Sequence, residues 1–484
     1  MRNIESLLED RVFYYFDKIT KIPRESFHEE KIRQFLIDFA KEHNLEFYTD
    51  KIGNVIIKKE ATEGYAESDS IILQGHMDMV CEKDEESNID FSNDPIEYKI
   101  EGDRIVAEHT TLGADNGIAV AMILAILESD EYKHPKIEAL FTVNEENGMT
   151  GAKNLENKYL DSKMLLNIDS EDEGRGCVSC AGGQRDLITF KKEYKEIDES
   201  LDFYDLIVSG LKGGHSGQEI HKGLGNSNKI LARSLYRIFD KFDSELIQIE
   251  GGAKPNAIPR LAKAKIALSA EDKIELQKLI VEINGELVKE LGKVDPDVRL
   301  NLEVSKEKTN RAFTDDLADR IIKLINILPD GVMSMSKNIE GLVESSVNVG
   351  VIIDGDEDVE IITNVRSQLS SLKDNIANMN KIAASLCGAE FEVQSDYPAW
   401  EYKENSKLRD IASNCYKEIT GEELILEEIH AGLECGLFKE TIGDIDMLSV
   451  GPDMDGVHAP GENLSISSTE RVFKFVVKIL EELK

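Results

Sequence analysis

Five short clusters of acidic residues and histidines stand out along the chain, and four of them close apolar runs. They are Gln74–Asp78, Leu112–Gly117, Asn144–Gly148, Asn167–Asp169 and Gly456–Gly461. Together they supply two histidines and several carboxylates, which is the ligand set that a pair of divalent metal ions requires. We therefore start from the hypothesis of a hydrolase that uses two metal ions.

Each cluster also has an ordinary structural explanation when it is taken alone. An aspartate before Asn-Gly, such as Asp115, is typical of a turn or a helix N-cap. The pair Glu145 and Glu146 is typical of a solvated face, and a histidine that follows a strand, such as His76, is usually only hydrogen-bonded. Packing alone does not require four independent apolar runs to end in such residues. Their joint occurrence therefore favours a metal site.

The apolar runs in front of the clusters predict the elements that would position them. Buried strands are expected at Ile71–Leu73, Ile137–Val143, Met164–Ile168 and Met447–Val450. Helices are expected at Glu29–His43, Gly117–Leu127, Leu408–Thr420 and Glu470–Leu483, of which Gly117–Leu127 is apolar nearly all round and should be buried. Strands that alternate with helices predict an α/β sheet with a parallel component. In such sheets ligands bind outside the carboxyl ends of the strands, where the clusters would converge.

The pattern of residue types changes between about Arg185 and Tyr397, where the clusters of ligand-type residues no longer occur. We therefore expect a catalytic domain interrupted by an inserted domain, with residues 1–185 and 398–484 as its two parts and 186–397 as the insert. The predicted class is α/β, with a mixed, largely parallel sheet and flanking helices in the catalytic domain. The insert is expected to be α+β.

The length and composition of the chain argue against several classes of protein. A chain of 484 residues exceeds one ordinary core, and its net charge of −37 would repel nucleic acid and anionic membranes. Neither a signal peptide at Met1–Ser6 nor a run of about 20 apolar residues is present, so a cytoplasmic protein is expected. The lone pair Cys177 and Cys180 favours free thiols over a structural zinc site, and leaves a redox role open.

The order of the motifs resembles the family of dinuclear zinc exopeptidases that includes carboxypeptidase G, aminoacylase and several dipeptidases. The resemblance covers essentially the whole chain, from Ile22–Ser26 and Asp50–Asn54 to the loop of His458. Gly213–Gly217 and His430–Gly436 are similar to the aminoacyl-histidine dipeptidase branch of this family.

The resemblance implies a role for each candidate in the clusters. One metal would be held by His76 and Asp169 and the other by Glu146 and His458, with Asp115 as the bridge. Asp78 would orient the imidazole of His76, and Glu145 would be the catalytic acid and base. Adjacent strand residues point to opposite faces, so the different roles of Glu145 and Glu146 require a bend, for which Asn147–Gly148 is suitable.

The resemblance also implies substrate-binding residues. His215 would support the oxyanion and Arg366 would bind the terminal carboxylate of a dipeptide, with Asn256 and Glu434 as further contacts. A turn histidine and a surface arginine are the alternative interpretations of His215 and Arg366. If they do act on the substrate, the insert is a lid that excludes water, and a homodimer is the favoured assembly.

The expected activity is hydrolysis of short peptides, including dipeptides with C-terminal histidine, by a hydroxide shared between two metals and with Glu145 as acid and base. Zinc is the expected metal, and manganese and cobalt are compatible with the same ligands. A deacylase or tripeptidase with the same metals and a non-catalytic scaffold stay open as alternatives, although a scaffold needs neither Glu145 nor a complete ligand set. No P-loop or Rossmann glycine pattern supports nucleotide binding. The expected partner is a small peptide substrate.

Overall fold

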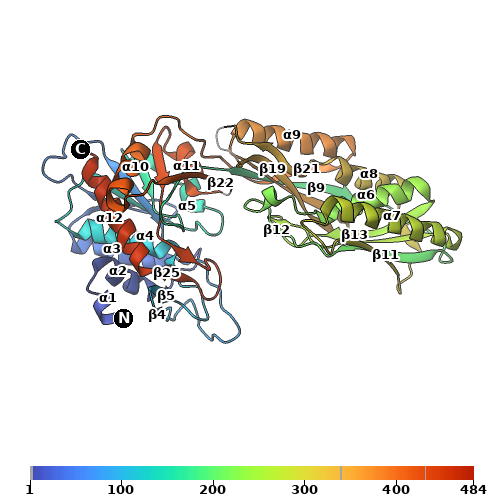
Figure 1. The fold of residues 1–484 in the computed structure, drawn as a ribbon, viewed down its shortest axis with the longest axis horizontal. Coiled ribbons are helices and arrows are strands. Elements are labelled where there is room, and N and C mark those ends of the chain that lie inside the picture. Colours follow the sequence, from blue (N-terminus) through green and yellow to red (C-terminus); the bar gives the residue numbers. More distant parts are fainter. Residues whose placement is uncertain (1–3, 338–340, 431) are drawn as a thin grey trace. The chain divides into compact units, whose positions relative to one another are not determined.

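The computed structural model describes residues 4–337, 341–430 and 432–484, and the chain divides into two compact units (Figure 1). Unit 1 comprises Met1–Ser179, Tyr402–Glu428 and Leu433–Lys484, and unit 2 comprises Cys180–Glu401 and Ile429–Gly432. The blue N-terminal and red C-terminal segments in Figure 1 therefore both belong to unit 1. The predicted roles of the two parts, catalytic domain and lid, stay predictions.

Unit 1 is built on an eight-stranded sheet. In sheet order its strands are β1 (Glu46–Thr49), β2 (Val55–Lys59), β6 (Ile137–Thr142), β3 (Ile71–His76), β7 (Met164–Asn167), β23 (Asp446–Ser449), β8 (Arg175–Cys180) and β22 (Ile425–Ile429). Strand β3 runs parallel to β6 and β7, and β7 runs parallel to β23. The pairs β1–β2, β2–β6 and β8–β23 are antiparallel. The predicted mixed α/β sheet is confirmed.

Four helices of unit 1 lie where the hydrophobic pattern predicts, with bounds that differ by a few residues at most: α3 (Glu30–Glu42), α4 (Ala114–Glu128), α10 (Lys407–Thr420) and α12 (Ile466–Glu482). The unit also contains α1 (Ile4–Leu7), α2 (Arg11–Thr20), α5 (Thr150–Lys153) and α11 (Glu434–Thr441), which are not among the predicted helices. A smaller sheet joins β24 (Met454–Asp455), β25 (Asn463–Ser465), β5 (Arg104–Val106) and β4 (Lys99–Glu101). Strand β25 follows the loop of His458, so this sheet ties the late segment of the chain to the region before Asp115.

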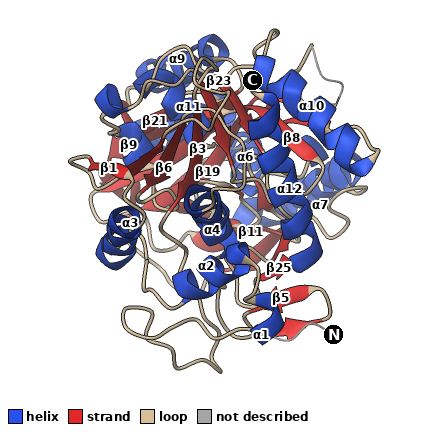
Figure 2. Cartoon of the chain, turned by 90° about the vertical axis from the view of Figure 1, so that its left-hand side faces the viewer, coloured by secondary structure: helices blue, strands red, loops and turns tan. Residues whose placement is uncertain are grey.

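Helix α4 is the centre of the unit 1 core. Every residue from Ile118 to Leu127 is buried, which explains why the helix is apolar all round. It packs against strand β3 and helix α2 (Figure 2). Among the described residues no helix is long and apolar enough to cross a membrane.

Unit 2 is built on a nine-stranded sheet in which the paired strands are antiparallel. Its main path is β16 (Arg299–Val304), β11 (Asp202–Ser209), β15 (Ala262–Leu268), β13 (Ser244–Gly251), β19 (Val343–Asp354), β20 (Asp358–Ser367), β9 (Gly182–Lys191) and β21 (Glu390–Tyr397), and β18 (Gly331–Met335) pairs with β19. The helices are α6 (Ser227–Lys241), α7 (Lys273–Leu291), α8 (Asp315–Ile327) and α9 (Ser370–Leu386). Alternate strand residues such as Leu206 and Val208 share one apolar core with these helices, as period-two burial requires.

Leu124 in helix α4 tests the importance of this core. Leu124→Ala should lower the free energy of unfolding of unit 1 by about 2–5 kcal/mol, because it removes buried methyl groups and leaves a cavity. Ile274→Ala in helix α7 is the control, because Ile274 is 65% exposed and its loss should change stability by less than about 0.5 kcal/mol. Denaturant unfolding of both variants measures the difference. Equal effects would show that α4 does not carry the core.

Candidate metal centre

Four parallel strands of unit 1 bring the predicted ligands to one edge of the sheet. His76 is the last residue of β3, and Asp169 follows the end of β7 by two residues. Glu145 and Glu146 follow β6, and His458 lies further along the chain after β23, in the turn between β24 and β25. Because the carboxyl ends of β6, β3, β7 and β23 lie side by side, residues far apart in sequence meet there.

A bend separates the two adjacent glutamates after β6. The backbone φ angle is 53° at Asn144 and 110° at Gly148, so the chain leaves the strand before Glu145 and turns sharply. The amides of Glu145 and Glu146 donate to the two carboxylate oxygens of Asp78 over 3.0 and 3.2 Å. The side chain of Asp78 therefore stabilises this turn. Because the turn begins one residue before Glu145, the side chains of Glu145 and Glu146 do not have to point to opposite faces as they would in a strand.

Asp78 is a fully buried carboxylate that links the two sides of the site. Its Oδ1 lies 3.3 Å from Nδ1 of His76, and its Oδ2 accepts a hydrogen bond of 2.8 Å from the hydroxyl of Ser26. Together with the amides of Glu145 and Glu146, these contacts fix the His76 ring relative to the glutamate turn. This arrangement suits the orienting role that the sequence predicts for Asp78.

Asp115 lies between the two histidines. Its Oδ1 is 2.9 Å from Nε2 of His76, and its Oδ2 is 3.2 Å from Nε2 of His458. Asp115 and Asn116 do not have helical backbone angles although they stand at the start of α4, and the peptide bond between them is cis. The Asn116 side chain accepts from the His76 amide over 3.2 Å and donates to the Ile168 carbonyl over 2.7 Å. The start of α4 is thus joined to the ends of β3 and β7.

The remaining contacts complete overlapping groups of ligand atoms. Nε2 of His76 lies 3.4 Å from Oδ1 of Asp169, and Nε2 of His458 lies 2.8 Å from Oε2 of Glu146. Within the part of the chain that the structure describes, three groups have ligand atoms within 4.8 Å of one another: His76, Asp115 and Asp169; His76, Glu145 and Glu146; and Asp115, Glu146 and His458. Asp115 belongs to one group with each histidine, which is the arrangement of a bridging carboxylate.

The pKa values of several side chains in the site are shifted from their ordinary values. Burial raises the pKa of Asp169 to about 6, and the charges of Asp115 and Glu146 act in the same direction against that of His76. Burial likewise raises the pKa of Glu145 well above its ordinary value, helped by Asp169 and Glu146. Hydrogen bonds to Asp115 and then Glu146 raise the pKa of His458 to about 11. The carboxylates therefore carry negative charges that repel one another, and a bound cation would reduce this repulsion.

The donor set fits divalent cations. Oε1 of Glu146 is buried and has no hydrogen-bond partner among the described residues. Mixed imidazole and carboxylate ligands suit zinc, manganese and cobalt. The crowded carboxylates, the shared position of Asp115 and this unpartnered oxygen all favour cations over a purely hydrogen-bonded cluster.

Glu434 lies in the same unit, buried at the start of α11. Its Oε2 accepts hydrogen bonds from the Gln74 amide over 2.6 Å and from the Thr142 hydroxyl over 2.8 Å, while Oε1 is buried without a hydrogen-bond partner among the described residues. Burial raises the pKa of Glu434 to about 8, and its charge in turn raises the pKa of Glu145. The structure thus places Glu434 with the candidate ligands in unit 1.

The other predicted substrate residues lie together in unit 2. Strand β12 (Gly214–His215) pairs with β14 (Ala257–Ile258), and the amide of Ser216 donates to the carbonyl of Asn256 over 2.9 Å. Arg366 is buried on β20 and donates to the Tyr397 hydroxyl over 3.1 Å. Burial, and then the charge of Arg366, lower the pKa of His215. Arg366 is therefore not the exposed surface arginine of the alternative interpretation.

Sequence reasoning missed several buried polar residues in both units. His430 in unit 2 is buried, and its Nε2 lies 2.7 Å from the Ser346 hydroxyl. Burial, and then the charges of Arg366 and His215, lower the pKa of His430 to about 3. Arg24 and Glu462 are buried near Asp115. Arg24 and His430 belong to the motifs on which the family resemblance is based. The spacing of residues in the sequence does not, however, predict which groups they contact.

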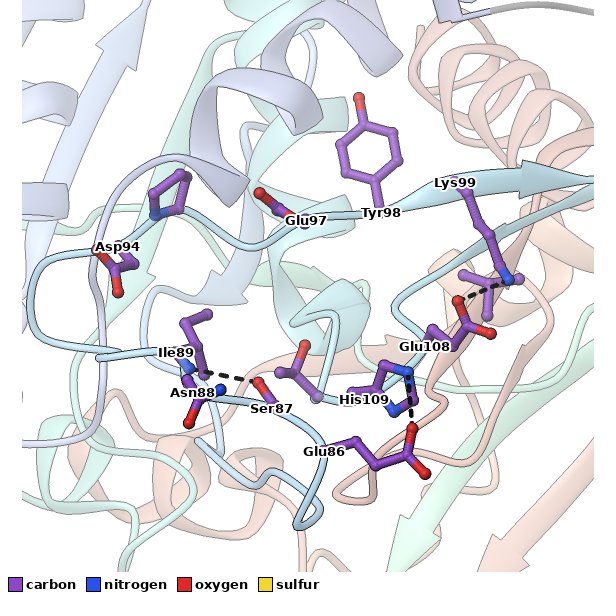
Figure 3. Close-up of a pocket in the computed structure, with 13 residues that line it drawn as sticks. Glu86, Ser87, Asn88, Ile89, Asp94, Glu97, Tyr98, Lys99, Glu108 and His109 are labelled. Carbon is purple, nitrogen blue, oxygen red and sulfur yellow. Dashed lines mark hydrogen bonds and ion pairs between the residues drawn. The ribbon is translucent and has the colours of Figure 1, made fainter.

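A large cavity of unit 1 lies elsewhere. It has a volume of about 630 Å³, and its lining includes Glu86, Tyr98 and His109, with an ion pair of 2.8 Å between Lys99 and Glu108 (Figure 3). None of the predicted site residues lines it. Cavity size would therefore not have located the metal centre.

Comparisons with known proteins agree on one family. The model of peptidase family M20/M25/M40 matches residues 72–482. The chain is 38% identical over 485 residues to the cytosol non-specific dipeptidase of Escherichia coli (strain K12), covering 100% of this chain and 99% of that protein. The crystal structure of aminoacylhistidine dipeptidase from Vibrio alginolyticus matches with a TM-score of 0.92 at 40% identity, over 99% of this chain and 98% of that one. Aminopeptidase PepT from Bacillus cereus shares the fold at 16% identity, with a TM-score of 0.57 over 98% of each chain.

Asp78 offers a test of how the centre is supported. Asp78→Ala should weaken metal binding by about 10–100-fold, because His76 and the glutamate turn both lose their common acceptor. Asp84→Ala is a matched control, since Asp84 also pairs with a histidine, His109, but on the surface at 2.9 Å. Calorimetric titration of metal-free protein with zinc measures both. Unchanged affinity in the Asp78 variant would remove its orienting role.

Proposed function

The chain belongs to peptidase family M20/M25/M40, and we propose that it is a dipeptidase that depends on two divalent metal ions. The predicted family resemblance is confirmed. The relative from Escherichia coli is a non-specific dipeptidase and the one from Vibrio alginolyticus is an aminoacylhistidine dipeptidase. We therefore propose dipeptides as the substrate class, including those with C-terminal histidine.

The position of Asp115 carries the proposal. Its two oxygens face two different histidines at 2.9 and 3.2 Å, and each histidine lies beside a further carboxylate, Asp169 or Glu146. A single metal needs only one such group. Two groups that share one carboxylate support a pair of ions, which when bound would activate a water molecule and polarise the peptide carbonyl. We propose zinc as the metal, with manganese and cobalt as substitutes.

Glu145 is the proposed acid and base. It shares a group of possible ligand atoms with His76 and Glu146, and burial raises its pKa, which suits a residue that takes up a proton during the reaction. It would accept a proton from the attacking water and return it to the leaving amine. Asp78 holds the amide of Glu145, which keeps this side chain in place during both transfers.

Glu434 is the proposed acceptor for the free amino group of the substrate. Its Oε1 is buried and has no hydrogen-bond partner among the described residues, and a buried oxygen of this kind is costly unless a ligand donates to it. An ammonium group would supply that donor together with a positive charge, whereas an acylated amine has one N–H and no charge. Glu434 therefore favours a dipeptidase over a deacylase.

The residues of unit 2 complete the proposal. Arg366 would pair with the substrate carboxylate, His215 would donate to the oxyanion, and Asn256 would be a further contact. Their clustering within unit 2 supports a shared role, and the low pKa of His430 beside Arg366 keeps that histidine from adding a second positive charge. The lid function of this unit and a homodimeric assembly stay predictions. A cytoplasmic location is proposed from the name of the Escherichia coli relative.

Glu145→Ala should lower kcat by about 10²–10⁴-fold, because proton transfer in the reaction loses its acid and base. Metal content should stay near that of the wild type, since the five proposed ligands remain. Elemental analysis beside steady-state kinetics separates these two effects. Activity comparable to that of the wild type would remove Glu145 as the base.

A substrate panel tests the reaction class. We expect the zinc-loaded protein to hydrolyse free dipeptides, among them β-alanyl-histidine, and to lose activity on chelation and regain it with zinc, manganese or cobalt. Glu434→Gln should lose more activity on free dipeptides than on their N-acetylated forms, because only the former present an ammonium group. Preference of the wild type for N-acyl amino acids would establish a deacylase, and full activity without metal would contradict the two-metal account.

A further inference from the structure

Glu462 is a buried carboxylate that has no part in the reaction described above. It is 2% exposed and stands four residues after His458. Its Oε2 accepts from the amides of Leu112 and Gly113 over 2.6 and 3.0 Å. Its Oε1 accepts from the amides of Ala114 and Asp115 over 2.8 and 3.4 Å. One side chain therefore holds four successive backbone amides, the last of which belongs to Asp115.

These amides stand at the start of helix α4, where backbone N–H groups have no partner within the helix. Gly113 at the cap position provides no side-chain acceptor, and Asp115 and Asn116 depart from helical geometry. A turn of this kind would be free to adopt other conformations without an outside acceptor. Glu462 supplies that acceptor from a segment more than three hundred residues away, and a helix N-terminus favours its negative charge.

Arg24 holds the same turn from its carbonyl side. It is fully buried, and Nη2 donates to the carbonyl of Gly113. Its Nη1 donates to the carbonyls of Met77 and Asp78 over 3.2 and 2.6 Å. The turn before Asp115 is thus fixed between a carboxylate on its amides and a guanidinium that also binds the segment after His76.

A buried carboxylate at this place carries an electrostatic cost. Burial, and then the charge of Asp115, raise the pKa of Glu462, and the helix N-terminus and the nearby guanidinium of Arg24 offset part of this cost. A neutral Ser or Asn side chain could cap a helix start without this cost. A carboxylate can, in contrast, accept several hydrogen bonds at once, which suits a turn whose exact position matters.

We propose that Glu462 is a positioning residue that fixes Asp115 as the bridge between the two metal ions. The segment Val457–Glu462 would then deliver a ligand, His458, and the anchor of the bridging ligand together. Without the anchor, the carboxylate of Asp115 would no longer face both His76 and His458. This inference rests on the proposed two-metal function.

Metal titration of Glu462→Gln tests the inference. The amide keeps the size of the side chain, but its NH2 group would face backbone N–H groups. We expect zinc to bind about 10–100-fold more weakly than in the wild type. Glu128→Gln, at the other end of helix α4, removes the same charge from a surface pair with Arg11 and should bind zinc as the wild type does. At saturating zinc the Glu462 variant should recover activity, since Glu145 and all ligands remain.

The outcomes are distinct. Two zinc ions bound with wild-type affinity by folded Glu462→Gln would overturn the inference. If circular dichroism and gel filtration show that this variant does not fold, Glu462→Asp, which withdraws the carboxylate by one methylene, is titrated in its place, with the same expectation. Failure of both variants to fold would also overturn the inference, because Glu462 would then be required for the fold itself. Absence of metal binding in the wild type would defeat the proposed function instead.

Discussion

The repulsion among partly buried carboxylates at one edge of the unit 1 sheet is the constraint on which the rest of the site depends. Asp115, Glu145, Glu146 and Asp169 are brought together there with two histidines among the described residues. Such a cluster is unfavourable unless cations or protons neutralise it, and burial raises the pKa of Asp169 and Glu145 in the absence of a cation. The same repulsion that destabilises the cluster alone gives it affinity for divalent ions.

Backbone amides and buried side chains hold this cluster in place against its own repulsion. Asp78 accepts from the amides of Glu145 and Glu146, and Glu462 accepts from the amides around Asp115. Both anchors are themselves carboxylates, so they add charge while they fix geometry. The outcome is a set of ligand atoms whose spacing is determined by hydrogen bonds outside the set, as in other metal sites.

Much of the fold of unit 1 could be predicted, because burial leaves a periodic mark on the sequence. The strands that end near His76 and Asp169 and the buried helix after Asp115 follow from apolar runs. The contacts of Arg24 and Glu462 could not be predicted in this way, since a side chain that binds the backbone of a distant segment leaves no periodic signal. The roles of His215 and Arg366 came from family resemblance, and their grouping within unit 2 depends on antiparallel pairing across a long insert.

Anomalous X-ray diffraction from crystals of the zinc-loaded protein tests the two-metal site most directly. We expect two anomalous peaks about 3.5–4 Å apart, with one oxygen of Asp115 on each ion. His76 and Asp169 should contact one peak, and Glu146 and His458 the other. A single peak, or two peaks without Asp115 between them, would contradict a pair of metal ions bridged by Asp115.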